Sequence, residues 1–338
     1  MRGAVLYGPR DVRFEERATP AIIEPTDAVI RMSATCVCGS DLWPYRGINP
    51  INQPTPMGHE YCGIVEEVGK AVSRIKQGQF VIGSFFYSDN TCPNCQAGYH
   101  SSCQQKGFIG DAQAPFLRVP LADGTLVATP EVPSDDMVPS LLTLSDVMGT
   151  GWFAATAADV KPGGKVVVVG DGAVGLLGVL SARELGAERI IVMSRHPARQ
   201  RLAREFGATD IVTERGDAGV VHVLELTNGV GGDSVLECVG TQDSMMQAIR
   251  STRPGGSVGY VGVPHGVELD GEKLFFTHVR LHGGPAPVRR FLPELIDQVW
   301  NGKINPGRVF DLTLPLECVA EGYRAMDERR AIKTLLRP

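Results

Sequence analysis

The stretch 165–196 restricts the possible folds of this chain more than any other part of the sequence. It begins with a run of valines, 166–169, whose β-branched apolar composition is typical of a strand buried in a parallel sheet. The run leads directly into the motif Gly170-x-Gly172-x-x-Gly175, and a helix is predicted over 173–185. A second strand is predicted over 189–193. Strand, glycine turn, helix and strand in this order form the context in which such a motif indicates dinucleotide binding.

Each glycine of the motif has a separate structural role. Gly170 permits a tight turn after the strand, Gly172 lets the backbone approach a pyrophosphate, and Gly175 lets helix and strand pack closely. The phosphates are expected at the helix N-terminus, where unpaired N–H groups and the helix dipole favour anions. The predicted cofactor-binding residues of this region are Gly170, Asp171, Gly172, Ala173, Val174 and Gly175, together with Val263 at the end of a later predicted strand.

The end of the second strand distinguishes between the two nicotinamide cofactors. A site for NAD carries Asp or Glu about twenty residues past the glycines, where it binds the ribose 2′-hydroxyl. This chain has Ser194 and Arg195 there, and Arg199 follows one helical turn later. Serine offers a hydrogen-bond donor to a 2′-phosphate, and arginine offers a charged, planar, bidentate partner. The sequence therefore favours NADP over NAD.

Length and composition limit the classes of protein that need to be considered. A chain of 338 residues is too long for one ordinary core, so two domains are expected. The net charge of −5 and the lack of a basic run argue against nucleic acid as the main partner. No apolar stretch approaches membrane length and the first residues contain no signal-peptide core, so a cytoplasmic location without membrane contact is expected. The eight cysteines are then more naturally metal ligands or buried thiols than disulfides.

The pattern of the chain changes twice along its length. Residues 1–145 contain short apolar-alternating runs separated by Gly and Pro, which predicts a largely antiparallel, barrel-like domain. A helical segment is predicted over 140–159, after which strands and helices alternate as in a doubly wound parallel sheet. The last strand, 331–336, is expected to pack back on the N-terminal domain. We therefore predict a nucleotide domain over 146–285 and a second domain formed by 1–145 and 286–338.

The N-terminal part contains a first group of potential metal ligands. It combines Cys38 with the neighbouring His59 and Glu60, and Asp146 in the helical segment is a further candidate. A catalytic zinc needs about three protein ligands of Cys, His or carboxylate type and one open position. Cys36 competes with Cys38, because side chains two positions apart on a strand point the same way. The spacing alone does not choose between them.

A second group of potential ligands lies in a loop rich in Gly, Asn and Ser. It has the pattern Asp89-x-x-Cys92-x-x-Cys95, followed by Cys103. Three cysteines at tight spacing with a carboxylate at the next interval predict a closed, tetrahedral zinc site. A metal there would order a loop that is otherwise too polar to fold. The alternative is a reduced lobe without metal.

The chain resembles the zinc-dependent medium-chain dehydrogenases/reductases over essentially its whole length. The motifs that carry the resemblance, in the family's order, are Cys38-Gly39-Ser40-Asp41, Gly58-His59-Glu60, the lobe from Cys95-Gln96-Ala97-Gly98 to Cys103, and Gly170-x-Gly172-x-x-Gly175. The resemblance implies a Rossmann nucleotide domain and a GroES-like catalytic domain. The lobe departs from the family, which usually has four cysteines where this chain has Asp89 and three cysteines.

The resemblance also implies roles for individual residues. Cys38, rather than Cys36, would bind the catalytic zinc together with His59 and Asp146. Asp146 resembles the third ligand of the bacterial secondary-alcohol branch, in which Glu60 can be a fourth ligand of the resting site. The pair Ser194-Arg195 is similar to what NADP-preferring members of that branch carry.

These residues predict a zinc alcohol dehydrogenase that transfers a hydride between NADP(H) and a small alcohol, ketone or aldehyde. Zinc would act as a Lewis acid on the substrate oxygen. The resemblance implies that Ser40 accepts the alcohol proton and that Asp41 orients the zinc-bound histidine. The alternatives are a turn-capping hydroxyl for Ser40 and a solvated charge for Asp41. A homo-oligomer, tetramer or dimer, is expected by analogy.

Two other functions were compared with this prediction. A metal-independent reductase of the same fold, acting on quinones or activated double bonds, needs the glycine motif but has no use for Cys38, His59 and Asp146 together. A non-enzymatic NADP-binding protein has no use for filled metal and proton-relay positions. The sequence therefore favours the zinc enzyme.

Overall fold

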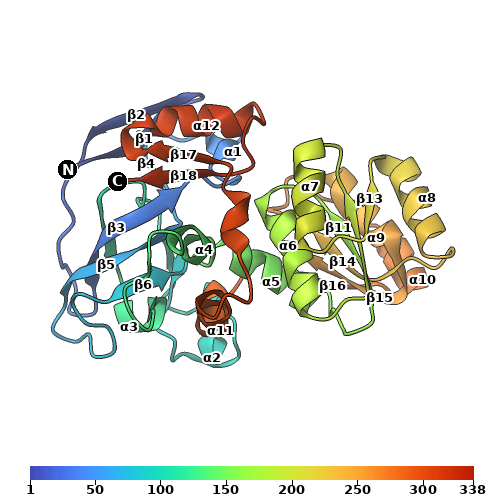
Figure 1. The fold of residues 1–338 in the computed structure, drawn as a ribbon, viewed down its shortest axis with the longest axis horizontal. Helices are drawn as coiled ribbons and strands as arrows, with labels where there is room; N and C mark the ends of the chain where they lie inside the picture. Colours follow the sequence, from blue (N-terminus) through green and yellow to red (C-terminus); the bar gives the residue numbers. More distant parts are fainter. The chain divides into compact units, whose positions relative to one another are not determined.

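The chain folds into two units, and the computed structural model describes residues 1–338 (Figure 1). Unit 1 consists of Met1–Asp146 and Pro287–Pro338, whereas unit 2 consists of Val147–Ala286. None of the helices is both long and apolar enough to cross a lipid bilayer.

Unit 1 is built mainly from antiparallel sheets. The largest has the order β10-β6-β5-β3-β18-β17, with β9 also paired to β3, and smaller sheets have the orders β2-β1-β4 and β7-β8. Only the pair β17–β18 is parallel. The strands are β1 (Arg2–Gly8), β2 (Asp11–Glu16), β3 (Ala28–Cys36), β4 (Thr55–Pro56), β5 (Tyr61–Val68), β6 (Phe80–Gly83), β7 (Phe86–Tyr87), β8 (Gly107–Phe108), β9 (Phe116–Val119), β10 (Leu126–Ala128), β17 (Leu312–Pro315) and β18 (Thr334–Arg337).

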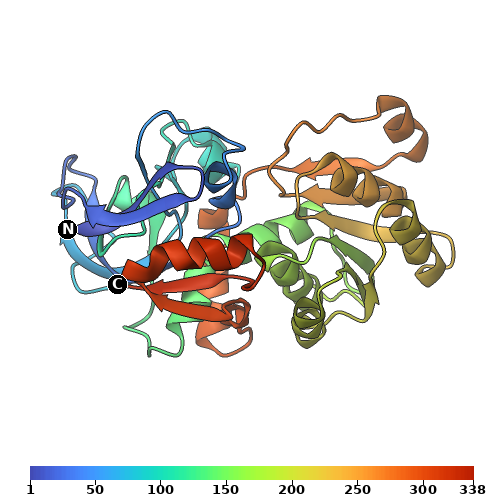
Figure 2. The same ribbon diagram turned by 90° about the horizontal axis from the view of Figure 1, so that it is seen from above.

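The helices of unit 1 are mostly short. They are α1 (Leu42–Tyr45), α2 (Pro93–Gln96), α3 (Ala122–Thr125), α4 (Val138–Thr143), α11 (Val288–Trp300) and α12 (Val319–Asp327), with 3-10 turns at His100–Ser102, Pro306–Val309 and Leu316–Cys318. Helix α12 packs across β17 and β18, as Figure 2 shows.

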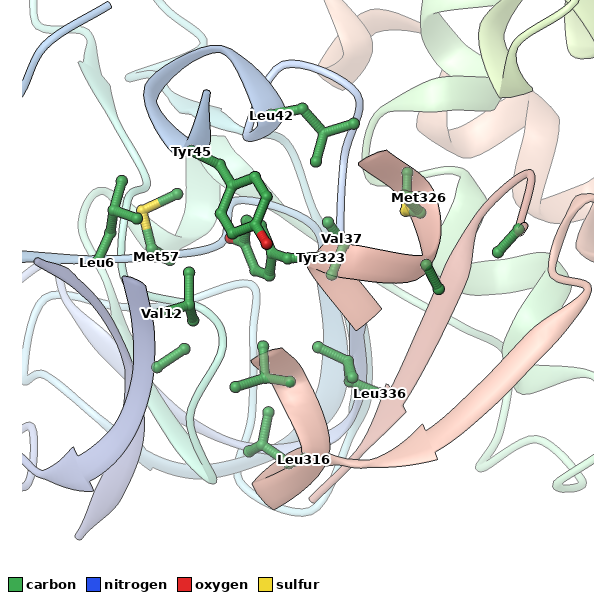
Figure 3. Packing of buried hydrophobic residues seen from close by; sticks show 14 residues of the cluster. Leu6, Val12, Val37, Leu42, Tyr45, Met57, Leu316, Tyr323, Met326 and Leu336 are labelled. Atoms are coloured by element: carbon green, nitrogen blue, oxygen red, sulfur yellow. The ribbon is translucent and has the colours of Figure 1, made fainter. Parts of the chain in front are cut away.

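The two ends of the chain share one hydrophobic core in unit 1. Leu6, Val12 and Met57 from the N-terminal part cluster with Tyr323 and Leu336 from the C-terminal part (Figure 3). In addition, β18 pairs antiparallel with β3. The expected return of the tail to the N-terminal domain is thus confirmed.

The last strand begins later than the sequence predicts. It starts at Thr334 and not at Ala331. The backbone N–H groups of Ile332 and Lys333 donate instead to Asp311 Oδ1, at 2.8 and 3.3 Å, so these residues do not enter the ladder.

Unit 2 is a doubly wound α/β domain, so the predicted fold class is confirmed. Its six strands are all parallel in the order β13-β12-β11-β14-β15-β16, which reverses direction between β11 and β14. The strands are β11 (Lys165–Val169), β12 (Arg189–Met193), β13 (Asp210–Val212), β14 (Gly232–Glu237), β15 (Thr252–Tyr260) and β16 (Arg280–Gly283). The helices are α5 (Val147–Ala157), α6 (Ala173–Glu184), α7 (Pro197–Phe206), α8 (Gly216–Leu226), α9 (Gln242–Ser251) and α10 (Gly271–Thr277).

Small residues allow α6 to lie close to its neighbours in unit 2. A Cβ added at Gly178 would lie 2.9 Å from Leu236 Cδ2, and one added at Gly151 on α5 would lie 2.8 Å from the Gly178 nitrogen. Side chains at these positions would therefore push both helices outward. The central strand β11 is buried from Val166 to Val169, as expected for a parallel strand covered on both faces.

The helical segment predicted over 140–159 consists of more than one helix. The segment forms two helices, α4 and α5, which are separated at Leu144–Asp146. Ser145 fixes this break, because its hydroxyl donates to the Gly83 carbonyl at 2.6 Å and accepts from the Tyr61 N–H at 3.0 Å. The break places Asp146 outside regular helix.

Candidate active site and cofactor-binding edge

Strand pairing brings Cys38 close to His59 and Glu60. Thr35 near the end of β3 pairs with Tyr61 at the start of β5, so the residues that follow β3 lie beside those that precede β5. Gly58 has φ +98°, and a Cβ there would lie 2.5 Å from Gln113 Cγ. Only glycine fits this position without strain, and it sets the direction in which His59 leaves the turn.

Asp146 completes a buried cluster with these residues. Its Oδ2 lies 3.2 Å from His59 Nε2 and 3.5 Å from Cys38 Sγ. One ligand atom from each of Cys38, His59, Glu60 and Asp146 lies within 4.8 Å of all the others. All four residues are buried, and Cys36 is not part of the cluster.

Asp41 holds the histidine from the other side. Its Oδ1 lies 3.3 Å from His59 Nδ1, and its Oδ2 accepts from the Cys38 N–H at 2.9 Å. Burial lowers the pKa of His59, but the charges of Asp41 and Cys38 and the hydrogen bond to Asp146 outweigh burial and raise it well above its usual range. Asp41 is buried and is therefore not a solvated charge.

The donor set and the charges of this cluster fit a zinc ion. Thiolate, imidazole and carboxylate groups are the usual zinc ligands. Glu60 Oε2 is buried without a hydrogen-bond partner, which leaves an oxygen for a cation. Burial and the Asp146 carboxylate raise the pKa of Cys38, an effect that a bound divalent cation reverses. A divalent cation would also compensate the excess of buried carboxylates in the cluster.

A single buried lysine supplies part of that compensation. Lys333 is 1% exposed, and its ammonium donates to Glu60 Oε1 at 2.6 Å and to the Val37 carbonyl at 3.2 Å. Burial raises the pKa of Glu60, and Lys333 opposes this effect. The pair therefore fixes the Glu60 carboxylate beside the other potential ligands.

The second predicted group also comes together in the structure. Ligand atoms of Asp89, Cys92, Cys95 and Cys103 lie within 4.8 Å of one another. Cys92 Sγ is 3.6 Å from Cys95 Sγ and 3.9 Å from Cys103 Sγ. Partial burial raises the pKa of Asp89, but the N–H groups of Thr91 and Cys92 outweigh it and hold the pKa at about 2. An ionised carboxylate beside three sulfur atoms fits a closed zinc site.

The glycine motif has the geometry expected of a phosphate-binding turn. Gly170 has φ +118° at the end of β11, and a Cβ at Gly175 would lie 2.1 Å from the Gly170 carbonyl oxygen. A Cβ at Gly172 would meet nothing within 4 Å, so the backbone is open there, at the N-cap of α6. Ala173 and Val174 form the first turn of α6. This turn lies beside the point where the strand order reverses, which is where doubly wound sheets bind ligands.

Val263 lies beyond the strand that was expected to carry it. The strand β15 ends at Tyr260, and the N–H groups of Val261 and Gly262 both donate to the Glu237 carbonyl. Val263 is therefore in the following loop, where it is 52% exposed and its backbone contacts Gly240.

The residues at the end of β12 have different environments. The Ser194 hydroxyl is buried and donates to Asp171 Oδ2 at 2.7 Å, and Arg199 Nη1 lies 3.2 Å from Asp171 Oδ1. The Ser194 hydroxyl thus donates its hydrogen bond to another residue of the protein, whereas the sequence predicted that it would donate to a 2′-phosphate. Arg195 is exposed. Its side chain is therefore accessible to a ligand.

Comparison with known proteins identifies the family of this chain. Residues 24–140 match the alcohol dehydrogenase GroES-like domain, and residues 173–300 match the zinc-binding dehydrogenase domain. The chain belongs to the zinc-dependent medium-chain dehydrogenases/reductases.

Individual zinc-type alcohol dehydrogenases are similar along the whole chain. Zinc-type alcohol dehydrogenase B of Aspergillus flavus is 33% identical over 350 residues, covering 100% of this chain and 81% of that protein. The structure resembles alcohol dehydrogenase TADH from Thermus sp. ATN1 with a TM-score of 0.92 and 31% identity, over 100% of this chain and 99% of that one. Zinc-dependent alcohol dehydrogenase 2 from Streptococcus pneumonia gives a TM-score of 0.91 and 30% identity, over 100% and 98% of the chains. These relatives do not favour the metal-independent reductase.

Aromatic residues beside the cluster of potential zinc ligands in this alcohol dehydrogenase were not predicted from the sequence. The His59 ring centroid is 5.4 Å from that of Phe108 and 6.2 Å from that of Phe85. Phe86 joins them at 5.2 Å from Phe85 and 5.6 Å from Phe108. Phe108 is 55% exposed, which is unusual for so large an apolar side chain. No sequence pattern marks Phe86 and Phe108, because β7 and β8 are only two residues long, and Phe85 lies in the bend before β7.

The cysteine lobe of this alcohol dehydrogenase provides a direct test of a second zinc. We expect Cys95→Ser to lose the lobe's zinc and to lower the Tm by about 5 °C or more, because a structural metal contributes folding free energy. Zinc content by mass spectrometry and thermal unfolding by circular dichroism measure the two effects. The exposed Cys318 gives the control, since Cys318→Ser should change neither quantity. Unchanged zinc content in Cys95→Ser would show that the lobe is a metal-free fold.

Proposed function

We propose that this chain is an NADP-linked zinc alcohol dehydrogenase that interconverts a small alcohol and its ketone or aldehyde. The observation that carries the proposal is the buried cluster of Cys38, His59 and Asp146, with Asp41 held against His59. This set matches the ligand number and types of a catalytic zinc site. The proposed cytoplasmic location and the proposed dimer or tetramer stay predictions.

The residues of the site have distinct proposed roles. Cys38, His59 and Asp146 would hold the zinc, with Glu60 as an additional ligand of the resting site. When bound, zinc supplies Lewis-acid polarisation of the substrate oxygen. Asp41 keeps Nδ1 of His59 protonated and thereby leaves Nε2 as the ligand atom.

Ser40 is the proposed acceptor of the alcohol proton. It lies two residues after Cys38, and α1 starts directly after Asp41, yet no side chain caps this helix. The lack of a side-chain cap supports the proton-acceptor role of Ser40 over the turn-capping alternative. Its half-buried position leaves the hydroxyl available to a substrate bound at the cluster.

The rings of Phe85, Phe86 and Phe108 favour substrates with an apolar substituent. They form a continuous aromatic surface that begins at His59. An apolar or aryl group on the carbinol carbon would gain contact area there, whereas a polyol would leave hydroxyl groups unpaired. We therefore propose small secondary alcohols and aryl or alkyl ketones as the first substrates to assay.

The proposed preference for NADP rests on the charges at the end of β12. Arg195 is exposed, and Arg199 compensates the charge of Asp171, which accepts from Ser194 at this edge. A positively charged edge suits a 2′-phosphate better than a 2′-hydroxyl. An NADP-dependent isopropanol dehydrogenase of Clostridium beijerinckii is 31% identical over 313 residues, and a zinc-binding dehydrogenase structure from Sinorhizobium meliloti contains NADP. Another structural relative is NAD-dependent, so relatives of both kinds exist.

The cofactor proposal predicts a selective loss in one variant. Arg195→Ala should reduce kcat/KM for NADPH by about 10-fold or more, because a charge-assisted hydrogen bond contributes about 1.5–3 kcal/mol. The value for NADH should change little. Steady-state kinetics with both cofactors on a panel of small ketones and aldehydes gives the answer. Arg201→Ala, an exposed arginine of α7, is the matched control and should resemble the wild type. An NADH preference in the wild type, or an equal loss for both cofactors, would contradict the proposal.

A further inference from the structure

A cavity of about 550 Å³ in unit 1 is not explained by either metal cluster or by the glycine motif. It lies between the cysteine lobe and the first turn of α11. Its lining includes Arg74, His100, Arg289 and Arg290, with Asn90 and Gly98 from the lobe. Helix α11 packs against the 3-10 turn His100–Ser102, so the parts of α11 and of the lobe that line the cavity are in contact with each other.

The cavity concentrates positive charge without a matching carboxylate. None of its three arginines forms an ion pair with an acidic side chain. Burial, and then the charge of Arg74, lower the pKa of Arg289. The charge of Asp89 raises the pKa of His100. Oδ1 of Asp89, however, already accepts hydrogen bonds from the N–H groups of Thr91 and Cys92. The half-buried Arg289 is thus repelled by a neighbouring cation, and a bound anion would relieve this repulsion.

Two buried polar atoms of the cavity residues have no partner. Arg289 Nε is buried and makes no hydrogen bond. His100 is 7% exposed, and its Nδ1 is likewise unpartnered while Nε2 lies 2.6 Å from Asn90 Oδ1. Nε2 of His100 donates to the Asn90 amide oxygen, so Nδ1 of the neutral ring is an acceptor, and Arg289 Nε is the unpartnered donor. Buried donors without partners are rare in folded proteins, and an absent ligand is one of the usual reasons.

The backbone around the cavity supports the same ligand chemistry. Arg289 and Arg290 lie in the first turn of α11, which has no acidic residue and no side-chain cap. The N-terminal end of a helix favours anions, so the two arginines add to a field of the same sign. Gly98 has φ +89°, and a Cβ there would lie 3.0 Å from Arg290 Nη1, so the guanidinium group rests directly on the lobe.

We propose that this cavity binds a phosphate-type dianion, either inorganic phosphate or the phosphate group of a small metabolite. Arg289 and Arg290 would bind it through paired N–H donors, and Arg74 would add a third cation from the cavity lining. A bound dianion would connect α11 to the cysteine lobe and thereby stabilise the lobe against unfolding.

Isothermal titration of the zinc-loaded, full-length protein with inorganic phosphate tests the proposal. The protein is first saturated with NADP, which occupies any phosphate site at Arg195. Chloride at equal ionic strength provides the baseline. Phosphate should bind the wild type, and Arg289→Ala/Arg290→Ala should weaken the binding at least 10-fold. Arg324→Ala, an exposed arginine of α12 outside the cavity, should bind phosphate as the wild type does.

The same series contains the results that would overturn the proposal. Absence of phosphate binding to the wild type, or equal binding to the double variant, would do so. If the double variant does not fold, Arg74→Ala replaces it, because this side chain is exposed and its removal leaves the lobe intact. A change of oligomeric state in sedimentation, without any phosphate binding, would assign the arginines to a subunit contact instead. Inorganic phosphate and a phosphate monoester, titrated separately, distinguish the two sources of the ligand.

Discussion

Replacement of Cys38 by serine is expected to remove both the catalytic zinc and nearly all turnover. Cys38 Sγ lies 3.5 Å from Asp146 Oδ2 in a cluster that offers only one sulfur ligand. A hydroxyl is a much poorer zinc ligand than a thiolate. Loss of the metal forfeits several kcal/mol of transition-state stabilisation, so turnover should fall by about 10³-fold or more.

Metal content and turnover, both measured on the same samples, test this prediction. Cys38→Ser should lose one zinc and keep the zinc of the lobe. The contrasting variant is Ser40→Ala, which removes the proposed proton acceptor without touching a ligand, so it should lose most turnover and keep both metals. Treatment of the wild type with a chelator should reproduce the Cys38→Ser result. Chelator-resistant turnover would contradict the zinc mechanism and favour a metal-independent reductase of the same fold.

Parts of the site could be predicted because they are local in sequence. The glycine motif, its strand and its helix follow one another directly, and each glycine has the conformational reason that was expected of it. Cys38 and Asp41 lie within one turn, and His59 and Glu60 are neighbours. Asp146 is 87 residues from His59; its residue type made it a candidate, and resemblance to a family assigned it as the third ligand. Its position depends on the break between α4 and α5, which hydrophobic periodicity does not reveal because both helices are buried almost all round.

Other features depend on tertiary contacts that a sequence pattern does not contain. Ser194 has the residue type expected of a phosphate donor, but its hydroxyl is taken by Asp171, 23 residues earlier in the chain. Phe108 belongs to the site because its ring lies beside the His59 ring, and no local sequence pattern indicates this contact. Lys333 lies 273 residues from Glu60, in a stretch where a lone lysine would ordinarily be assigned to solvent.

Replacement of Lys333 by methionine is expected to cause a large loss of stability. Lys333 and Glu60 are 1% and 0% exposed, so the lysine variant leaves a carboxylate buried without its counter-ion. Breaking a buried ion pair from one side typically costs about 3–5 kcal/mol. Denaturant unfolding of the zinc-loaded protein measures the effect, with metal concentration held constant because bound metal adds its own stability. Lys70→Met, an exposed lysine, controls for the change of residue type.

The double variant Lys333→Met/Glu60→Gln separates an ion-pair effect from a packing effect. If the loss in Lys333→Met comes from the stranded Glu60 charge, removing that charge should recover most of the free energy of unfolding, because neutral replacements of buried pairs are often well tolerated. If the loss comes from the methionine side chain itself, the double variant should be no more stable than the single one. A Lys333→Met protein within about 0.5 kcal/mol of the wild type would contradict the ion-pair argument altogether. Zinc content of the Glu60→Gln variant then tells whether Glu60 also contributes to holding the catalytic metal.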